Sequence, residues 1–206
     1  MTTSNTPGPR PRRADVRELV LRAAAQAFLE RSYAAVSVAD IAAAAGFTKG
    51  AVYSNFGGKP ELFAAVLAEQ FTELIGSVLT TAMAAAETQE PSAVPHAVAV
   101  SLTRGVVADQ RLPTLLAEFR ALALRDAELA TVYAELRRQQ RAELEQLLAG
   151  VADRVPLAAG LDVAVAATLL LTCVNSLSLE YAAAPASMPE ALIEALLTHV
   201  MTGILA

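Results

Sequence analysis

The residues best suited to chemistry lie between positions 48 and 59. Both lysines of the chain, Lys49 and Lys59, fall in this stretch, among side chains that can donate hydrogen bonds. Gly50 has no side chain, so another molecule could approach the backbone closely there. Cations and donors on one face of a short helix suit the phosphates and base edges of duplex DNA. The donors are Thr48, Lys49, Tyr53, Ser54 and Asn55.

Apolar residues in the same segment give it a second face that can be buried. Val52 and Phe56 are four residues apart, so they share one side of a helix and leave Thr48, Lys49 and Tyr53 on the other. A helix this short is marginal in isolation. We therefore expect neighbouring helices to hold it while its outer face reads DNA. The alternative is an ordinary solvated helix.

The preceding residues have the signals of a helix and a turn that would position this segment. A longer helix is predicted over about 15–31 from apolar residues at three- and four-residue spacing. Ser37 can then cap a second helix, with Asp40 completing a capping-box pattern. Gly46 can take the left-handed conformation that ends that helix, and Thr48 can cap the next one. The spacing predicts a helix-turn-helix.

The run from Ser37 to Leu62 resembles the DNA-binding domain of the TetR family of bacterial repressors. In that family the pattern T-K-G-A-V-Y-x-x-F-x-x-K-x-x-L spans the recognition helix and the start of the next helix. This chain matches the pattern at Thr48, Lys49, Gly50, Ala51, Val52, Tyr53, Phe56, Lys59 and Leu62. The resemblance covers about residues 15–63, and the rest of the chain resembles the family only in length and all-helical pattern.

The resemblance implies roles for individual residues. Lys59 would contact a phosphate together with the N–H groups of its helix end, and Ser37 and Val38 could present N–H groups in the same way. Many relatives have serine where this chain has Gly58, so a hydroxyl contact to phosphate is expected to be missing. Contacts to bases and phosphates are implied for Thr48, Lys49, Gly50, Tyr53 and Ser54.

Charge is distributed unevenly along the chain. Residues 1–63 carry a net +3 and residues 64–206 a net −8, which gives −5 in all. A basic head on an acidic body suits a protein that meets phosphates at one end, although ordinary surface variation would give the same division. Residues 1–14 are rich in Thr, Pro and Arg and are predicted to be a disordered basic arm. Arg10, Arg12 and Arg13 would reach DNA from this arm, or the arm only aids solubility.

The remaining residues predict helices throughout. One long helix begins near Lys59, and its apolar stripe continues to Leu79, so it would join head and body without a flexible linker. Prolines separate five further predicted helices over 92–110, 113–124, 126–151, 161–184 and 189–205. The prediction is an all-α fold of about nine helices, with a helix-turn-helix domain over 15–63 and an effector-binding and dimerisation domain over 64–206.

The resemblance also implies an effector pocket enclosed by the middle helices. Polar and aromatic residues on otherwise apolar helices are the first candidates, because buried polar groups need partners. Each of them is individually more common as plain core than as a ligand contact. The candidates are Phe71, His96, Phe119, Arg120, Tyr133, Thr172 and Asn175.

A homodimer through the last two helices is a further implication of the resemblance. Both helices are apolar over a wide arc, which would be costly to leave in water, at about 25 cal/mol per Å². Intramolecular core is the alternative for part of each stripe. The stripes are Leu192, Ile193, Leu196, Leu197, Val200, Met201 and Ile204, and before them Val163, Ala167, Leu170, Leu171, Val174 and Leu177.

Several classes of function find no support in the sequence. Cys173 is the single cysteine, which excludes an internal disulfide, and His96 and His199 lack metal-ligand spacing. There is no glycine-rich phosphate loop or nucleophile elbow, so we expect neither an enzyme nor a bound metal or cofactor. The first residues lack the apolar core of a secretory signal. The strongest membrane candidate, 163–174, is shorter than the roughly 20 residues that span a bilayer, which predicts a cytoplasmic protein without membrane contact.

Together these observations predict a ligand-responsive transcriptional repressor. A homodimer would present two recognition helices to double-stranded DNA at a near-palindromic operator, and a small apolar effector would release it. One alternative is a DNA-binding regulator that has no effector or that activates transcription. A second is a helical small-molecule-binding protein or enzyme with a vestigial head. The effector, the operator and the regulated genes stay open.

Overall fold

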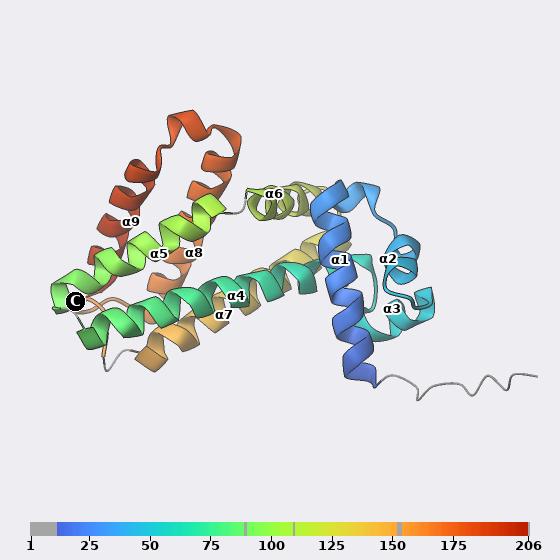
Figure 1. Ribbon diagram of the computed structural model, residues 1–206, viewed down its shortest axis with the longest axis horizontal. Helices are drawn as coiled ribbons and strands as arrows, with labels where there is room; N and C mark the ends of the chain where they lie inside the picture. Colours follow the sequence, from blue (N-terminus) through green and yellow to red (C-terminus); the bar gives the residue numbers. More distant parts are fainter. Residues whose placement is uncertain (1–11, 89, 109, 152–153, 206) are drawn as a thin grey trace, which may run out of the picture. The chain divides into compact units, whose positions relative to one another are not determined.

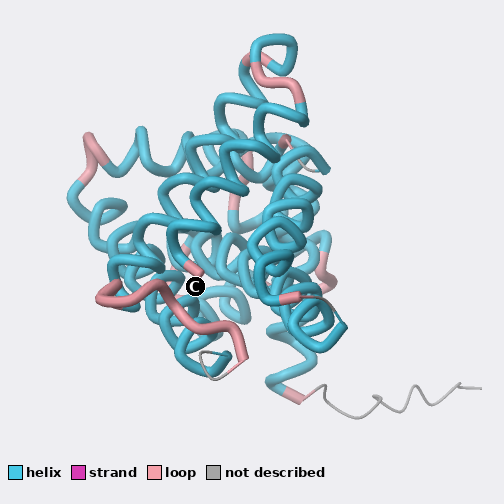
Figure 2. The backbone as a smooth tube through the Cα atoms, turned by 90° about the vertical axis from the view of Figure 1, so that its left-hand side faces the viewer, coloured by secondary structure: helices cyan, strands magenta, loops and turns pink. Residues whose placement is uncertain are grey.

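The structure is a computed structural model that describes residues 12–88, 90–108, 110–151 and 154–205. Over these ranges the chain forms nine α-helices and two single-turn 3₁₀ helices, and the predicted all-α fold is confirmed (Figures 1 and 2). The only β-pairing in the described ranges is an isolated bridge between Leu157 and Leu205. The chain divides into two compact units, here called the head and the body, between Val66 and Leu67.

The head is a small three-helix unit completed by the start of a fourth helix. An aromatic cluster fills its core, with 4.7 Å between the ring centroids of Phe28 and Phe63 and 4.9 Å between those of Tyr33 and Phe63. Edge-on and tilted rings at these separations are favourable packing geometries. The helices are α1 (Arg13–Ala35), α2 (Val38–Ala44), α3 (Lys49–Phe56) and the first turns of α4 (Lys59–Thr88).

Helix α1 differs from the prediction at both ends. It starts at Arg13, inside the predicted arm, while residues 1–11, including Arg10, lie outside the described residues. It also continues past residue 31 to Ala35, with one interruption at Ser32, whose φ of 69° and ψ of 167° are not helical. Leu19 is 40% exposed, whereas the neighbouring Leu21 is buried.

The body combines the rest of α4 with five further α-helices. Helix α5 lies along α9, and α8 contacts α5, α6, α7 and α9, so α8 is the central helix of this unit (Figure 1). Its core is mostly aliphatic, with Ala166, Ile193 and Leu197 fully buried. The helices are α5 (Val94–Ala108), α6 (Arg111–Ala123), α7 (Ala127–Val151), α8 (Val163–Ala183) and α9 (Glu190–Ile204), with 3₁₀ turns at Pro91–Ala93 and Pro185–Ser187.

Two helices among the described residues, α4 and α8, are long and apolar enough to cross a membrane. This finding corrects the sequence argument, which measured only the apolar run over 163–174, whereas α8 has 21 residues. Length and composition alone are weak grounds, because the core helix of a soluble protein meets the same criterion. In the body α8 packs against four other helices, and 28% of the residues in its most apolar 18-residue stretch are buried.

Candidate nucleic-acid interface and ligand cavity

Capping residues fix the two helices of the helix-turn-helix. The Asp40 backbone N–H donates to the Ser37 hydroxyl at 3.2 Å, and the Ser37 N–H and hydroxyl donate to the Asp40 carboxylate at 3.0 and 2.7 Å. The Ser37 hydroxyl, and then its backbone N–H, lower the pKa of Asp40. Gly46 makes the turn with a φ of +76°, and Thr48 caps α3 by accepting from the Ala51 N–H at 3.3 Å. Local hydrogen bonds therefore set where α3 begins.

Helix α3 presents one polar face to solvent. Val52 is completely buried, whereas the adjacent Tyr53 is 53% exposed. Thr48, Lys49 and Gly50 are also exposed, in the orientation that the spacing predicts. Phe56 on the inner side is half-buried, and the Arg17 guanidinium lies 5.0 Å from its ring centroid.

Asn55, predicted as a DNA contact, instead works inside the head. Its side-chain amide is half-buried and donates to the Ala51 carbonyl at 2.7 Å. Its amide oxygen accepts from the Arg13 Nε at 3.4 Å, and the Ser54 carbonyl accepts from the Arg13 Nη2 at 2.9 Å. Asn55 and Arg13 thus join the start of α1 to α3. The Ser54 side chain remains exposed, although its hydroxyl donates to the Ala51 carbonyl at 3.0 Å.

The other predicted contacts differ in what they can offer. The Lys59 Nζ lies 4.2 Å from the Tyr33 ring centroid, so its charge is held over an aromatic face. Val38 is buried, so only its backbone can face a partner, and the Ser37 hydroxyl is engaged with Asp40. At Gly58 an added Cβ would lie 2.9 Å from the Glu61 carboxylate. A serine there would have to displace Glu61.

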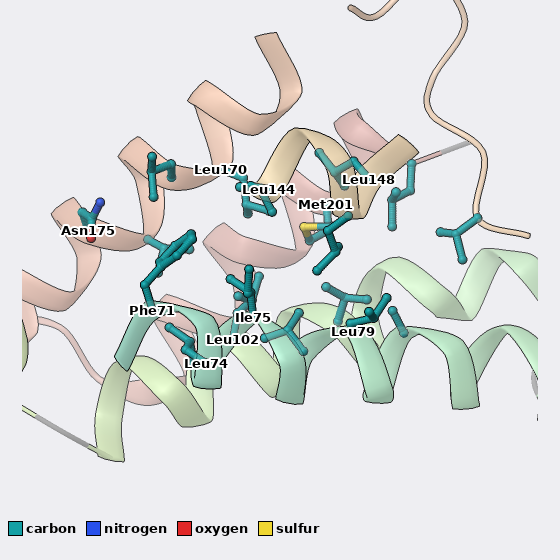
Figure 3. A pocket seen from close by; sticks show the side chains of 18 residues that line it. Phe71, Leu74, Ile75, Leu79, Leu102, Leu144, Leu148, Leu170, Asn175 and Met201 are labelled. Atoms are coloured by element: carbon teal, nitrogen blue, oxygen red, sulfur yellow. The ribbon is translucent and has the colours of Figure 1, made fainter. Parts of the chain in front are cut away.

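An apolar cavity of about 80 Å³ lies in the body between α4 and the helices α5, α7, α8 and α9 (Figure 3). Among the described residues that line it, Asn175 on α8 is the only polar one. The side chains of α4 point across the cavity toward α7 and α8. Its lining includes Phe71, Leu74, Ile75, Leu79, Leu102, Leu144, Leu148, Leu170 and Met201.

Two further cavities adjoin the apolar one through shared residues. The larger, of about 350 Å³, shares Phe71, Leu74, Val174 and Asn175 with it. The smaller, of about 30 Å³, is lined by Asn175 together with Arg120, Tyr133 and Arg137. Asn175 therefore lines all three cavities.

Four of the predicted ligand residues line these cavities. Phe71 and Asn175 line the apolar cavity, and Arg120 and Tyr133 line the smallest one. Phe119 is fully buried and packs edge-on against Tyr133, with 5.8 Å between ring centroids. Phe119 thus supports the cavity wall from behind.

His96 and Thr172 lie away from the predicted pocket, and both predictions are corrected. His96 is exposed on α5, with its Nδ1 3.4 Å from the Thr198 hydroxyl and its Nε2 3.8 Å from the Glu194 carboxylate. The side of α5 that faces the cavity carries Leu102 instead. Thr172 is exposed on the outer face of α8.

Sequence reasoning missed two polar residues of α7. Gln140 is only 4% exposed, and its side-chain oxygen accepts from the Arg137 Nη1 at 2.9 Å. Burial is the main cause that lowers the pKa of Arg137; Tyr133 opposes the shift, and the positive charge of Arg120 adds to it. The sequence did hold a signal for these residues. Spacings of four and three residues place Tyr133, Arg137 and Gln140 on the same helical face as Leu144.

The outer faces of α8 and α9 expose large apolar side chains. Val165 and Leu169 on α8 are 55% and 43% exposed, and Leu192 and Leu196 on α9 are 41% and 42% exposed. We name these four residues the α8–α9 patch. In the stripe predicted on α8, Ala167, Leu170 and Leu171 are buried, so this part of it belongs to the intramolecular core, the alternative that the sequence left open. The stripe predicted on α9 includes two faces of the helix. Leu192 and Leu196 are exposed, whereas the buried face carries Ile193, Leu197, Met201 and Ile204.

Family profiles match most of the chain. One profile, described as bacterial regulatory proteins of the tetR family, matches residues 20–66, and another, described as the C-terminal part of BetI-type transcriptional repressors, matches residues 95–206. The chain belongs to the TetR family. As a TetR-family protein it is a transcription regulator with an N-terminal helix-turn-helix DNA-binding domain, and it is not an enzyme.

Solved structures share the TetR-family fold at low sequence identity. A TetR-family regulator from Rhodococcus sp. superposes with a TM-score of 0.71 at 16% identity, covering 94% of this chain and 100% of its own. FadR from Bacillus subtilis in complex with stearoyl-CoA gives 0.60 at 18%, covering 91% and 98%. SmeT, the repressor of a Stenotrophomonas maltophilia multidrug efflux pump, gives 0.55 at 23%, covering 92% and 90%. No curated protein sequence gives a significant match.

Proposed function

We propose that this TetR-family regulator is a ligand-responsive repressor that binds a near-palindromic operator as a homodimer. The outer face of α3 carries the proposal. There Lys49 and Tyr53 are exposed beside Gly50, while Val52 anchors the helix in the head. Such a face offers one cation and one phenol to a DNA groove, and the glycine allows close approach.

Ser54 and Lys59 flank the proposed reading face. Ser54 is exposed at the side of α3, where its hydroxyl could turn to a phosphate. Lys59 and the N–H groups at the start of α4 would meet a phosphate near the Tyr33 ring. Thr48 and the Val38 backbone N–H would complete the phosphate contacts, whereas the Ser37 N–H already donates to Asp40 and would have to leave it to reach DNA. Asn55 holds α3 in place.

A second copy of the chain is the proposed partner of the α8–α9 patch. Four large apolar side chains on two packed helices form a surface that would be covered in a symmetric dimer. A dimer presents two α3 helices, and half-sites one helical turn of DNA apart would then be read together. The SmeT neighbour is a repressor, which supports the same direction of control here.

The apolar cavity is the proposed effector site. It lies against α4, which continues without a break from Lys59 in the head to Thr88 in the body. A ligand that displaces α4 would therefore act on the helix that also borders the reading face. A neighbour in this fold, FadR, was solved with stearoyl-CoA, which supports a ligand-binding body. The proposed location is the cytoplasm, because the regulator must reach the DNA that it binds.

Selection of bound DNA from random sequence tests the reading face. The full chain should select a near-palindromic site, and Lys49→Ala and Tyr53→Ala should each weaken binding to it by about tenfold or more, with a shallower salt dependence for Lys49→Ala. Arg138→Ala, which removes an exposed cation from the body, is the matched control and should bind like the parent. Parent-like binding by both α3 variants would exclude α3 as the reading helix.

Sedimentation of charged variants tests the dimer. Leu192→Asp and Leu196→Asp should convert the dimer to monomer, because each buries a carboxylate in an apolar contact. Leu124→Asp is the control, since Leu124 is 83% exposed and lies outside the patch. A dimer that survives both α9 changes would place the interface elsewhere.

A thermal-shift screen of apolar metabolites, followed by release from the selected DNA, tests the effector. A compound that raises the melting temperature and releases the DNA is expected. A regulator that binds the selected site and responds to none of the compounds would fit the alternative without an effector. Reporter expression that falls when the gene is deleted would identify an activator.

A further inference from the structure

A buried polar group lies where the three adjoining cavities share a lining residue. The Asn175 Nδ2 is buried and has no hydrogen-bond partner among the described residues. A buried donor left unsatisfied costs about 1–3 kcal/mol, so proteins rarely keep one without a use. A ligand atom that accepts a hydrogen bond would recover this cost.

Two arginines lie beside that junction, Arg120 exposed and Arg137 half-buried. Arg120 and Arg137 line the smallest cavity together with Asn175, and none of the described residues that line it is acidic. The Arg137 Nη1 donates to the neutral side chain of Gln140 at 2.9 Å. Burial of Arg137 and the nearby Arg120 both lower the pKa of Arg137, which means that its charged form is under-solvated. An anion would stabilise this arrangement.

The lining of the adjoining cavities changes from apolar to cationic. One end is lined by aliphatic side chains of α4, α7 and α8, and the other by the two arginines, with Asn175 lining both. Among the described residues that line the three cavities, Glu73 is the one acidic residue; it lines the larger cavity and accepts from the Gln70 side-chain amide at 3.3 Å. Glu73 does not line the smallest cavity.

We propose that the effector of this regulator is an amphipathic anion, an alkyl chain that ends in a carboxylate. Its chain would fill the apolar cavity, its carboxylate would lie between Arg120 and Arg137, and Asn175 would donate to an oxygen at the head. The inference rests on the proposed effector site and names the ligand class for it. A free acid and a carboxylate-bearing conjugate share this chemistry, and two arginines would repel a cationic head.

Two probes with the same chain separate the head-group contribution from the apolar one. In calorimetry with the full chain, decanoate should bind at least about tenfold more tightly than decan-1-ol, as expected for charge-assisted hydrogen bonds. Arg137→Gln and Arg120→Gln should each weaken decanoate about tenfold and leave decan-1-ol within about twofold. Arg137→Lys should retain part of the decanoate affinity, because the charge remains.

Arg138→Gln is the matched control, because Arg138 follows Arg137 on the same helix but is exposed and paired with Glu135. It should leave decanoate affinity at the parent value. Decanoylglycine, a conjugate that carries its own carboxylate, is tested beside decanoate, the free acid. The tighter binder of the two shows whether the effector is a free acid or a conjugate. Whichever of the two binds more tightly, its affinity should depend on Arg137.

Asn175→Leu provides a readout that a purely structural residue would not give. Removing an unsatisfied buried donor should raise the melting temperature of the free protein by about 2–4 °C. The same change should weaken decanoate by about tenfold, because the donor to the head is lost. A structural asparagine would instead lower the melting temperature when replaced.

The outcomes separate this inference from the proposed function. Equal binding of decanoate and decan-1-ol, or parent-like decanoate affinity in both arginine variants, would overturn the anionic head while leaving an apolar effector site intact. Binding by neither probe would also overturn the inference. The proposed function itself depends on DNA selection and the metabolite screen, which do not use these probes.

Discussion

The head and the body fill their cores in different ways. In the head, Phe28, Tyr33 and Phe63 pack ring against ring, and Val52 and Ile41 are completely buried. In the body, aliphatic helices enclose cavities, and the buried Asn175 Nδ2 has no hydrogen-bond partner in the part of the chain that the structure describes. Tight packing holds α3 in a single orientation, whereas loose packing beside α4 leaves room for a guest. The two regions thus divide recognition between a rigid surface and an adaptable interior.

The largest expected effect is in the head. Phe63→Ala should lower the free energy of unfolding by about 3–5 kcal/mol, because the lost ring leaves a cavity among aromatic neighbours that cannot collapse into it. Urea unfolding followed by circular dichroism measures the change. A loss below about 1 kcal/mol would mean that the head is as loosely packed as the body.

A smaller cost is expected for a leucine beside the apolar cavity. Leu144→Ala should cost about 2 kcal/mol, since one side of this residue already lacks neighbours. Leu62→Ala in the head, where the side chain is fully buried, is the matched change and should cost more in the same urea experiment. Equal costs would remove the distinction between the two cores.

A gain of stability is expected at the kink of α1. Ser32 has a φ of 69° and ψ of 167°, a conformation that favours glycine. Ser32→Gly should therefore stabilise the head by about 1 kcal/mol, visible as a higher melting temperature. Ser77→Gly, at an exposed helical position of α4, is the control and should destabilise by about 0.5 kcal/mol. Two losses of similar size would contradict the strain at Ser32.

The smallest effect concerns the cap of α2 and depends on pH. Hydrogen bonds from Ser37 lower the pKa of Asp40 in the folded protein, so the cap stabilises the head above the unfolded pKa of about 3.9. This contribution is lost as the pH falls through the lower, folded pKa. The melting temperature of Asp40→Asn should therefore lie below that of the parent at pH 6 and approach it at pH 3 and below. If the difference in melting temperature between Asp40→Asn and the parent did not change with pH, the charge of the carboxylate would not contribute to the cap.

Sequence alone predicted the head better than the body, for a physical reason. The ends of the head helices are set by local interactions, such as the cap at Ser37 and the turn at Gly46. These interactions join residues only a few positions apart, so the sequence pattern shows them directly. Asn55 escaped this reasoning because its partner, Arg13, is distant in the chain. Such a contact has no local signal.

Helix boundaries in the body were also predicted closely, but not the directions of its side chains. Helix α8 is apolar on nearly every side, so the pattern could not tell the buried Leu170 from the exposed Leu169. Thr172 was therefore assigned to the pocket although it faces outward. On α7, Arg137 and Gln140 line cavities. They were not predicted to do so because the same helix also carries many charged surface residues, and the pattern did not distinguish the two groups.

The two lysines, described above for their charge, also make the head chemically addressable. An amine-acylating reagent has only Lys49 and Lys59 as side-chain targets in this chain. Lys49 is open to solvent, whereas the Lys59 ammonium is held over the Tyr33 ring. Mass spectrometry of the protein labelled with and without DNA would thus report protection of these two amines separately, without a substitution in the chain.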